Sequence, residues 1–269
     1  MKDKRILYVS SEVVPYLPET EISSMSFEAP RMVNSVGGQI RIFMPRYGNI
    51  NERRHQLHEV IRLSGMNLVI NDLDMPLIIK VASIPKERMQ VYFIDNEDYF
   101  KRKATYADED GNFFDDNDER AIFFAKGVIE TVKKLNWSPD IIHVHGWLAS
   151  FLPLYLKTYY SNEPLFENSK IVTSLYNNGF DKTLNKELIN KIKFDGIDDA
   201  YIEHLKTPDY FNVMKTAIDN SDAVIVGSSE ISSDFETYLK NLEKPVLKYH
   251  NKEDFSQAYL DFYQSKVLD

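Results

Sequence analysis

Short runs of apolar residues alternate along the chain with longer stretches in which apolar residues recur every three or four positions. A short apolar run is typical of a buried strand, whereas the longer spacing is typical of a helix with one buried face. The sequence therefore predicts strands over residues 6–9, 39–44, 77–84, 90–94, 141–145, 170–175, 223–227 and 245–249. It predicts helices over residues 25–36, 119–135, 148–160, 211–220 and 229–242, and a last helix that begins after Asn251.

The order of these elements predicts the fold. Strands that alternate with helices form a mostly parallel sheet with helices on both faces. We therefore predict an α/β fold with a Rossmann-like, doubly wound, mostly parallel sheet, an inserted hairpin within residues 50–95, and a C-terminal strand-helix tail. Ligands of such sheets bind beyond the carboxyl ends of the strands. The loops to examine are then 10–24, 145–148, 176–182 and 227–230.

No segment of the chain has the composition of a flexible linker. We expect one Rossmann-like domain over residues 1–244, followed by a strand-helix cap over residues 245–269. The length of 269 residues agrees with one or two domains of about 150 residues each.

Composition narrows the function classes. The 32 Lys and Arg residues and the 41 Asp and Glu residues give a net charge of −9, which disfavours nucleic acid and anionic membrane surfaces as partners. The absence of Cys excludes disulfides, thiolate metal sites and cysteine nucleophiles, and it favours a reducing, cytoplasmic location. The longest apolar stretch is interrupted by polar residues and is too short to span a bilayer.

Two patterns bear on metal binding. His143 and His145 are two positions apart on a predicted strand and face the same side, but no third ligand accompanies them in the sequence. The stretch from Asp108 to Glu119 has acidic or amide residues at several positions of a calcium loop, but Phe113 stands where the sharp turn requires Gly. We therefore expect neither a bound metal nor a cofactor.

Five segments, in order, resemble the bacterial glycogen synthases and plant starch synthases. They are ILYVSSEVVPY, VGGQIRIFMPRYGNI, VYFIDNEDYFKR, the run from Asp116 to Lys157, and DAVIVGSSEIS. The resemblance implies the N-terminal, glucan-side half of a GT-B glycosyltransferase, in which two Rossmann-like domains face each other across a cleft that holds ADP-glucose. The implied reaction adds glucose to the non-reducing end of an α-1,4-glucan with retention of configuration.

The resemblance also implies a set of site residues. The family's His-Asp-Trp segment corresponds to His145-Gly-Trp147, and its active-site His-Asn pair corresponds to Tyr176-Asn177. In this interpretation Tyr176 contacts the sugar in place of His, Asn177 donates or accepts a hydrogen bond, and the Trp147 ring offers an apolar face to the sugar. The expected substrate-binding residues are Glu12, His145, Trp147, Tyr176 and Asn177.

The chain departs from the family pattern in four places. The family's Lys-Thr-Gly-Gly-Leu stretch is replaced by Leu17-Pro-Glu-Thr-Glu21, so the glycines and the Lys that suit a diphosphate give way to two carboxylates. The family's Asp is Gly146, and its later His is Tyr176. We also expect these 269 residues to hold no donor-binding domain.

Two functions remain open. In the first, the chain takes part in glucosyl transfer from ADP-glucose to α-1,4-glucan together with a donor-domain partner chain or a full-length synthase. In the second, it is a non-catalytic glucan-binding or regulatory protein of glycogen metabolism. The altered loop at 17–24 favours the second function mechanistically, because catalysis needs charge that is organised to meet the transition state.

Overall fold

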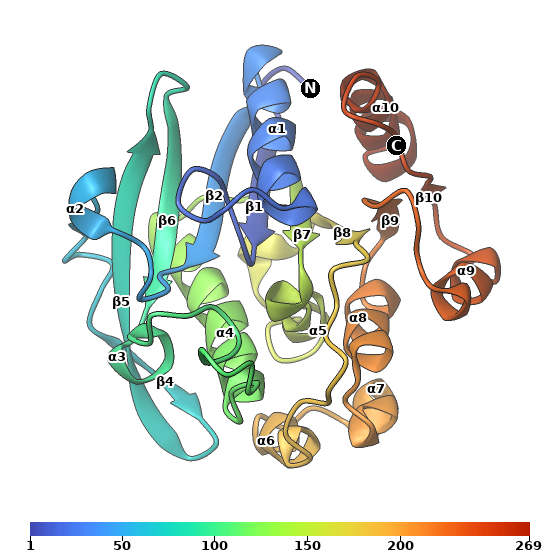
Figure 1. Cartoon of the computed structure of the whole chain (residues 1–269). Helices are drawn as coiled ribbons and strands as arrows, with labels where there is room; N and C mark the ends of the chain where they lie inside the picture. The colour runs from blue at the N-terminus through green and yellow to red at the C-terminus, as the bar shows by residue number, and fades with distance from the viewer.

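The computed structural model describes residues 1–269 and contains a ten-stranded sheet with helices on both faces (Figure 1). The strands lie in the order β10-β9-β8-β7-β1-β2-β6-β5-β3, and β4 pairs with β5 outside this path. Their bounds are β1 Arg5–Ser10, β2 Gln39–Pro45, β3 His58–Glu59, β4 Met66–Ile70, β5 Leu73–Ile84, β6 Met89–Asp95, β7 Ile141–His145, β8 Lys170–Leu175, β9 Ala223–Val226 and β10 Val246–Leu247.

Each neighbouring pair in the series from β10 to β6 is parallel, which confirms the predicted α/β fold. β1 lies in the middle, where Tyr8 pairs with Ile42 of β2 on one side and with His143 of β7 on the other. Every residue of β7 is buried, as expected for a parallel strand covered on both faces. β3, β4 and β5 form an antiparallel extension at one edge of the sheet.

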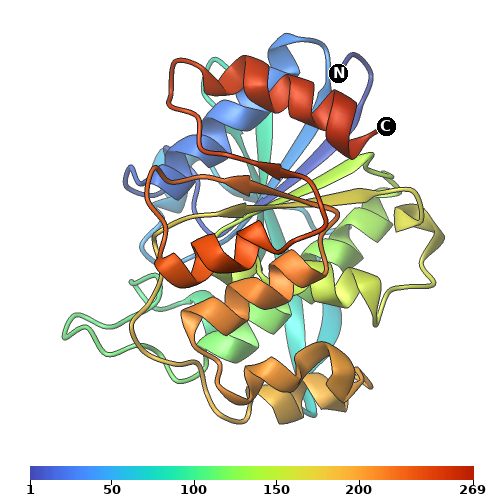
Figure 2. The same cartoon turned by 90° about the vertical axis from the view of Figure 1, so that its right-hand side faces the viewer.

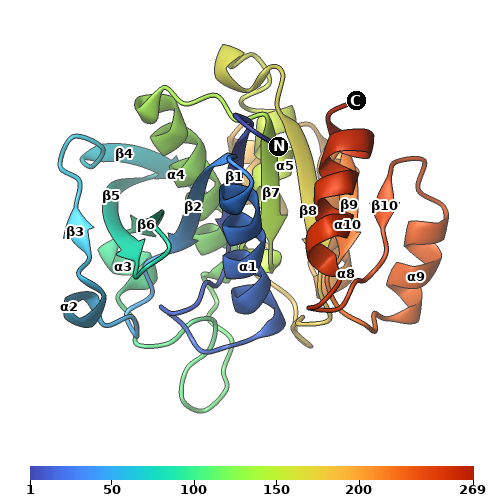
Figure 3. The ribbon, with the colours of Figure 1, turned by 90° about the horizontal axis from the view of Figure 1, so that it is seen from above.

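Helices cover the sheet in two layers (Figures 1 and 2). One layer is α1 (Glu21–Ser35) and α10 (Phe255–Phe262), and the opposite layer contains α4 (Asn117–Leu135), α5 (Phe151–Lys157) and α8 (Tyr210–Asp219). α9 (Ser233–Lys240) lies beside β10 at the edge (Figure 3). The short helices are α2 Glu52–His55, α3 Glu97–Phe100, α6 Leu188–Phe194 and α7 Asp199–Ile202, and 3₁₀ turns span Trp147–Ala149, Pro164–Phe166 and Glu203–Lys206.

Three sequence predictions need correction. The first helix begins at Glu21, because Thr20 and Ser23 form a reciprocal capping box that starts it ahead of the apolar stripe. The segment Met89–Asp95 is not part of an inserted hairpin alone, since it pairs in parallel with β2 as well as with β5. The expected helix over 148–160 is a 3₁₀ turn followed by α5, which ends at Lys157.

The residues after 244 pack against the main sheet. β10 adds to the sheet in parallel with β9. α10 lies beside α1 on the same face (Figure 3) and buries Phe255, Tyr259 and Phe262, and Tyr263 follows in a π turn over Tyr263–Val267. The division of the chain at residue 245 stays a prediction. No helix of the structure combines the length and the apolar character that crossing a bilayer requires.

Candidate functional site

The loops that follow β1, β8 and β9 meet at the carboxyl ends of the strands. The Ser228 hydroxyl donates to the carboxylate of Glu21, the first residue of α1. The same hydroxyl accepts the backbone N–H of Asn177 at 2.9 Å. One side chain therefore joins three loops that are far apart in the sequence, as the fold predicts for a ligand site in this position.

Hydrogen bonds within the protein hold the loop between β1 and α1. The Thr20 hydroxyl accepts the backbone N–H of Ser23 at 3.0 Å and donates to the Glu12 carboxylate at 2.8 Å. The Tyr106 hydroxyl donates to the other oxygen of Glu12 at 3.0 Å. Leu17 is also buried, so this loop is held by side-chain hydrogen bonds and apolar packing. It is not an open loop whose backbone N–H groups could surround an anion.

The start of α1 is acidic. A surface pocket of about 380 Å³ between α1 and the C-terminal tail is lined by the carboxylates of Glu19, Glu21 and Glu28 together with His250 and Lys252. Lys252 approaches Glu19 at 3.9 Å, and both side chains are largely exposed. The carboxylates outnumber the lysine, so the electrostatics at this helix terminus disfavour a diphosphate.

Two buried histidines lie below the rim on the α1 side of the sheet. The rings of His143 and His145 have centroids 4.0 Å apart, which confirms that they face the same side. His143 shares hydrogen bonds with the Tyr263 hydroxyl at 2.6 Å and the Ser174 hydroxyl at 2.8 Å, so both of its ring nitrogens have partners. Burial lowers the pKa of His145 to about 3 and that of His143 well below the ordinary value, so both rings are neutral at pH 7.

His145 is hydrogen-bonded to Tyr176, the residue to which the resemblance assigns the position of the family's active-site His. The Nδ1 atom of His145 and the Tyr176 hydroxyl share a hydrogen bond at 2.8 Å, while Nε2 of His145 is buried and has no partner. Tyr176 is 1% exposed, and burial raises the pKa of its phenol, which stays protonated. The adjacent Asn177 is exposed and leaves its side-chain amide free at the surface. Of this group, only Asn177 presents a polar side chain to a ligand in the present arrangement.

Gly146 cannot be replaced without rearrangement. Its φ of +80° lies in a region that favours glycine, and a Cβ there would be 1.9 Å from the Ser11 Oγ atom. Ile22 of α1 lies on the same side, 3.4 Å from that Cβ position. The loop after β1 therefore lies against Gly146 and leaves no room for the Asp side chain that the resemblance places at this position.

Trp147 is buried in a cluster of aromatic rings. Its ring centroid is 4.9 Å from that of Tyr106, 5.6 Å from that of Phe113 and 5.1 Å from that of Phe180. With 3% of its surface exposed, Trp147 has no open ring face for a sugar in this structure. Phe113 and Phe180, which come from two different loops, are half-buried and cover it.

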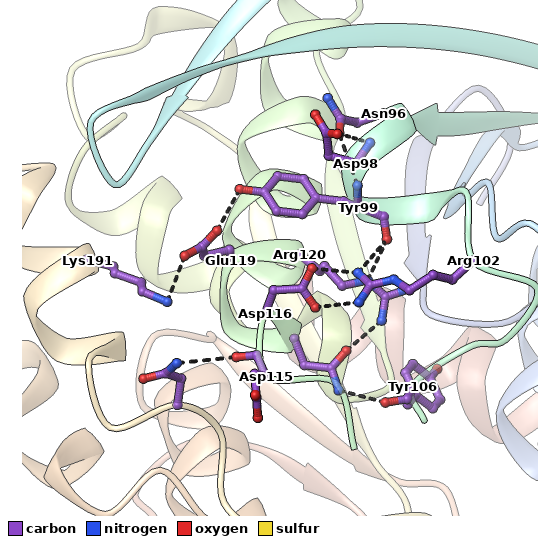
Figure 4. Close-up of polar contacts among 12 residues, drawn as sticks. Asn96, Asp98, Tyr99, Arg102, Tyr106, Asp115, Asp116, Glu119, Arg120 and Lys191 are labelled. Carbon is purple, nitrogen blue, oxygen red and sulfur yellow. Dashed lines mark hydrogen bonds and ion pairs between the residues drawn. The ribbon is translucent and has the colours of Figure 1, made fainter. Parts of the chain in front are cut away.

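A dense polar cluster surrounds the start of α4 (Figure 4). Arg102 pairs with both oxygens of Asp116, and the buried Arg120 donates to the Tyr99 carbonyl at 2.9 Å. Burial lowers the pKa of Arg120 to about 10, which leaves it charged at pH 7. These contacts anchor α3 and the segment before α4 to one another.

Lys191 joins α6 to the same cluster. Its Nζ atom lies 2.7 Å from Asp118 and 2.8 Å from Glu119, and Glu119 also accepts from the Tyr99 hydroxyl at 2.9 Å. Burial raises the pKa of Asp118 to about 6, against the lowering effect of Lys191. Asp108 instead accepts the backbone N–H of Asn112 at 2.8 Å. The carboxylates of the candidate calcium loop thus do not converge, and no group of three or more His, Asp or Glu side chains is arranged to hold a metal ion.

Sequence reasoning missed several residues at this rim. Tyr106 contacts both Glu12 and Trp147, and Phe113 and Phe180 cover the indole. The only local signal was the number of aromatic residues in the segments before α4 and after β8. Their convergence depends on contacts between distant loops, which periodicity does not report.

Comparisons with known proteins agree on one family. A family model described as the starch synthase catalytic domain matches residues 5–244. Relatives named glycogen synthase include one from Chlorobium luteolum, 34% identical over 234 residues, which cover 87% of this chain and 47% of the relative. Another, from Chlorobium phaeobacteroides, is 40% identical over 174 residues, which cover 64% of this chain and 36% of the relative.

A solved structure supports the fold. The catalytic domain of starch synthase IV from Arabidopsis thaliana, bound to ADP and acarbose, matches with a TM-score of 0.70 and 16% identity. The match covers 98% of this chain and 50% of that one. The chain thus spans about half the length of the relatives that it matches.

Proposed function

This chain belongs to the starch synthase catalytic domain family, and on that premise we propose that it supplies the glucan side of a glucosyl transfer from ADP-glucose to an α-1,4-glucan. The observation that carries the proposal is the family match over residues 5–244, together with the relatives named glycogen synthase. The rim of the sheet, where Asn177 is exposed beside the aromatic cluster, is the proposed acceptor face.

The same proposal places the donor outside the half of the family structure that this chain matches. Glu19 and Glu21 stand at the start of α1, and two unit charges about 4 Å apart repel by about 1 kcal/mol even in bulk water. A diphosphate therefore gains nothing from this helix terminus. A donor-domain partner chain or a full-length synthase would have to hold the ADP moiety.

A non-catalytic glucan-binding or regulatory role is the second candidate. One observation favours it: Tyr176 and Gly146, to which the resemblance assigns the positions of the family's active-site His and of the Asp in its His-Asp-Trp segment, are both fixed by packing. In that role the chain would bind glucan and no group would be transferred.

Calorimetric titration of the purified chain with ADP-glucose and, separately, with maltoheptaose tests the proposal. We expect glucan binding and no ADP-glucose binding. Micromolar binding of ADP-glucose by the lone chain would refute the assignment of the donor to a partner, and no binding of maltoheptaose would refute the glucan role. Transfer of labelled glucose to glycogen after addition of a donor-domain partner would then separate the enzymatic from the non-catalytic candidate.

A further inference from the structure

Phe113 and Phe180 form a pair of half-buried rings at the carboxyl rim of the sheet. Their centroids are 5.1 Å apart and their planes are inclined by 30°. Phe113 comes from the loop before α4, which projects from the molecule in Figures 2 and 3, and Phe180 comes from the loop after β8. Both rings contact the buried Trp147 indole, which holds the pair in place.

The loop that carries Phe113 is organised by its own hydrogen bonds. Ala107 and Phe113 form an antiparallel bridge, and the Asp108 N–H donates to the Asn112 carbonyl at 3.0 Å. The Asp108 carboxylate also accepts the backbone N–H groups of Asp110 and Asn112. The position of the Phe113 ring is thus fixed before any ligand arrives, which reduces the entropic cost of binding.

The loop that carries Phe180 is fixed in a different way. A Cβ at Gly179 would lie 2.5 Å from the Tyr210 ring, so this backbone runs directly against Tyr210. The Tyr210 ring also packs edge-on against Phe180 at 5.6 Å, and its hydroxyl donates to the Tyr176 carbonyl at 2.6 Å. The Phe180 ring is therefore coupled to the end of β8, where Tyr176 and Asn177 lie.

The groups around the two rings suit a neutral polyhydroxylated ligand. Asn112, Asn177 and Asn178 are exposed amide side chains on the same two loops and the end of β8. The nearby charges are of both signs, with carboxylates at Asp108 and Asp181 and the Lys182 ammonium close enough to act on Asp108, so no single charge dominates there. An aromatic face flanked by amides and carboxylates offers apolar contact together with hydrogen-bond donors and acceptors.

We propose that Phe113 and Phe180 form an aromatic platform on which a glucose unit of a neutral α-1,4-glucan rests, next to Asn177. This inference rests on the proposed function for the identity of the sugar, and it adds the residues that bind it. Both rings are half-buried whereas Trp147 is 3% exposed, so the platform supplies the ring surface that the buried indole does not.

The fluorescence of the buried Trp147 indole can report ligand binding at the two Phe rings. The chain has two Trp residues, and Trp137 packs under the Arg41 guanidinium, 5.1 Å from its ring centroid. A Trp137→Phe background leaves Trp147 as the only indole, in contact with both Phe rings. We expect maltoheptaose to change its fluorescence along a saturable curve, and calorimetry on the unaltered chain to give the same dissociation constant.

Two substitutions remove the platform and keep apolar volume. Phe113→Leu and Phe180→Leu should each weaken maltoheptaose binding about tenfold, since one aromatic contact contributes about that factor. Phe180→Tyr keeps the ring and should bind as the unaltered chain does. Phe194→Leu is the matched control, because Phe194 is a 55% exposed ring on α6 that is remote from Trp147.

The outcomes separate the two proposals. If the unaltered chain binds maltoheptaose and both Leu variants bind equally well, the platform is refuted and the glucan role stands. If the unaltered chain binds no glucan, the proposed function fails and the platform fails with it. An equal loss in Phe194→Leu, or a loss in Phe180→Tyr as large as in Phe180→Leu, would also overturn the platform, because the effect would then follow stability rather than the ring.

Discussion

Replacing Gly146 with Ala tests the close approach between the loops after β7 and β1. The substitution has two costs. The backbone at Gly146 has φ 80° and ψ 155°, a region that is essentially restricted to glycine and costs other residues about 1–3 kcal/mol. The new methyl group would lie 1.9 Å from the Ser11 Oγ atom, and overpacking of this kind costs about 1–3 kcal/mol.

The two costs together predict a loss of about 2–6 kcal/mol in the free energy of unfolding. For a chain of this size that corresponds to a fall in melting temperature of roughly 4–24 °C. Urea titration followed by circular dichroism measures the free energy, and a thermal scan measures the midpoint. The resemblance places an Asp at this position, so the same clash predicts that Gly146→Asp alone fails to restore a family-like site.

Two matched variants separate the costs. Gly196→Ala has a positive φ of +79° with no atom within 4 Å of the new Cβ, so it should show the cost of a positive φ without any overpacking. Ser11→Ala combined with Gly146→Ala removes the Oγ overlap and should recover about 1–3 kcal/mol relative to Gly146→Ala. A melting temperature within about 2 °C of the unaltered chain for Gly146→Ala, or strictly additive effects in the double variant, would refute the reasoning.

Three further predictions concern charge. Burial lowers the pKa of His145 to about 3 in the folded chain, from an unfolded value near 6.5. The unfolded chain therefore binds the extra proton first, and the free energy of unfolding falls as pH drops below about 6.5, by about 2 kcal/mol at pH 5. Urea titrations at pH 7 and pH 5 should show a smaller fall for His145→Gln, and an unchanged fall would contradict the assignment. Lys191→Met leaves Asp118 buried without its cation and should lower the free energy of unfolding by about 3–5 kcal/mol in the same urea titration. Adding Asp118→Asn should recover a large part of this loss. A Lys191→Met variant as stable as the unaltered chain would count against the buried ion pair. Glu21→Gln removes a negative charge at the start of α1, so in calorimetry at millimolar nucleotide it should strengthen the weak ADP binding of the chain by about 1 kcal/mol, or fivefold; equally weak binding by both chains would show that the charge does not set anion affinity.

The main sheet and its long helices could be predicted from the sequence because their signals are local. α4 has a long apolar stripe, and β7 is a short run in which only His143 and His145 interrupt the apolar residues, so the pattern identifies both. The pairing of β6 with β2 is not a local property, since the two strands are separated by the β3–β5 extension. The start of α1 depends on polar capping by Thr20, which the apolar pattern does not include.

The sequence predicts where the candidate site lies in the fold, but not which of its side chains are exposed. The fold directs attention to the loops after β1, β7, β8 and β9, and the structure brings Glu21, Asn177 and Ser228 together there. Whether Trp147 faces a ligand or the core depends on rings that arrive from the segments at 113 and 180. A single-sequence pattern carries no information on such contacts between distant loops.

The central position of β1 sets the order in which the molecule is completed during synthesis. β1 pairs with β7, so the hydrogen bond from the Arg5 N–H to Asp140 joins residues 135 positions apart. The face of the sheet around His143 stays uncovered until Tyr263 has left the ribosome, because that residue closes it from the C-terminal tail. A nascent chain of this topology exposes an apolar sheet face for most of its elongation. We therefore expect its folding yield to rise with chaperones that shield this face until Tyr263 can pack on it.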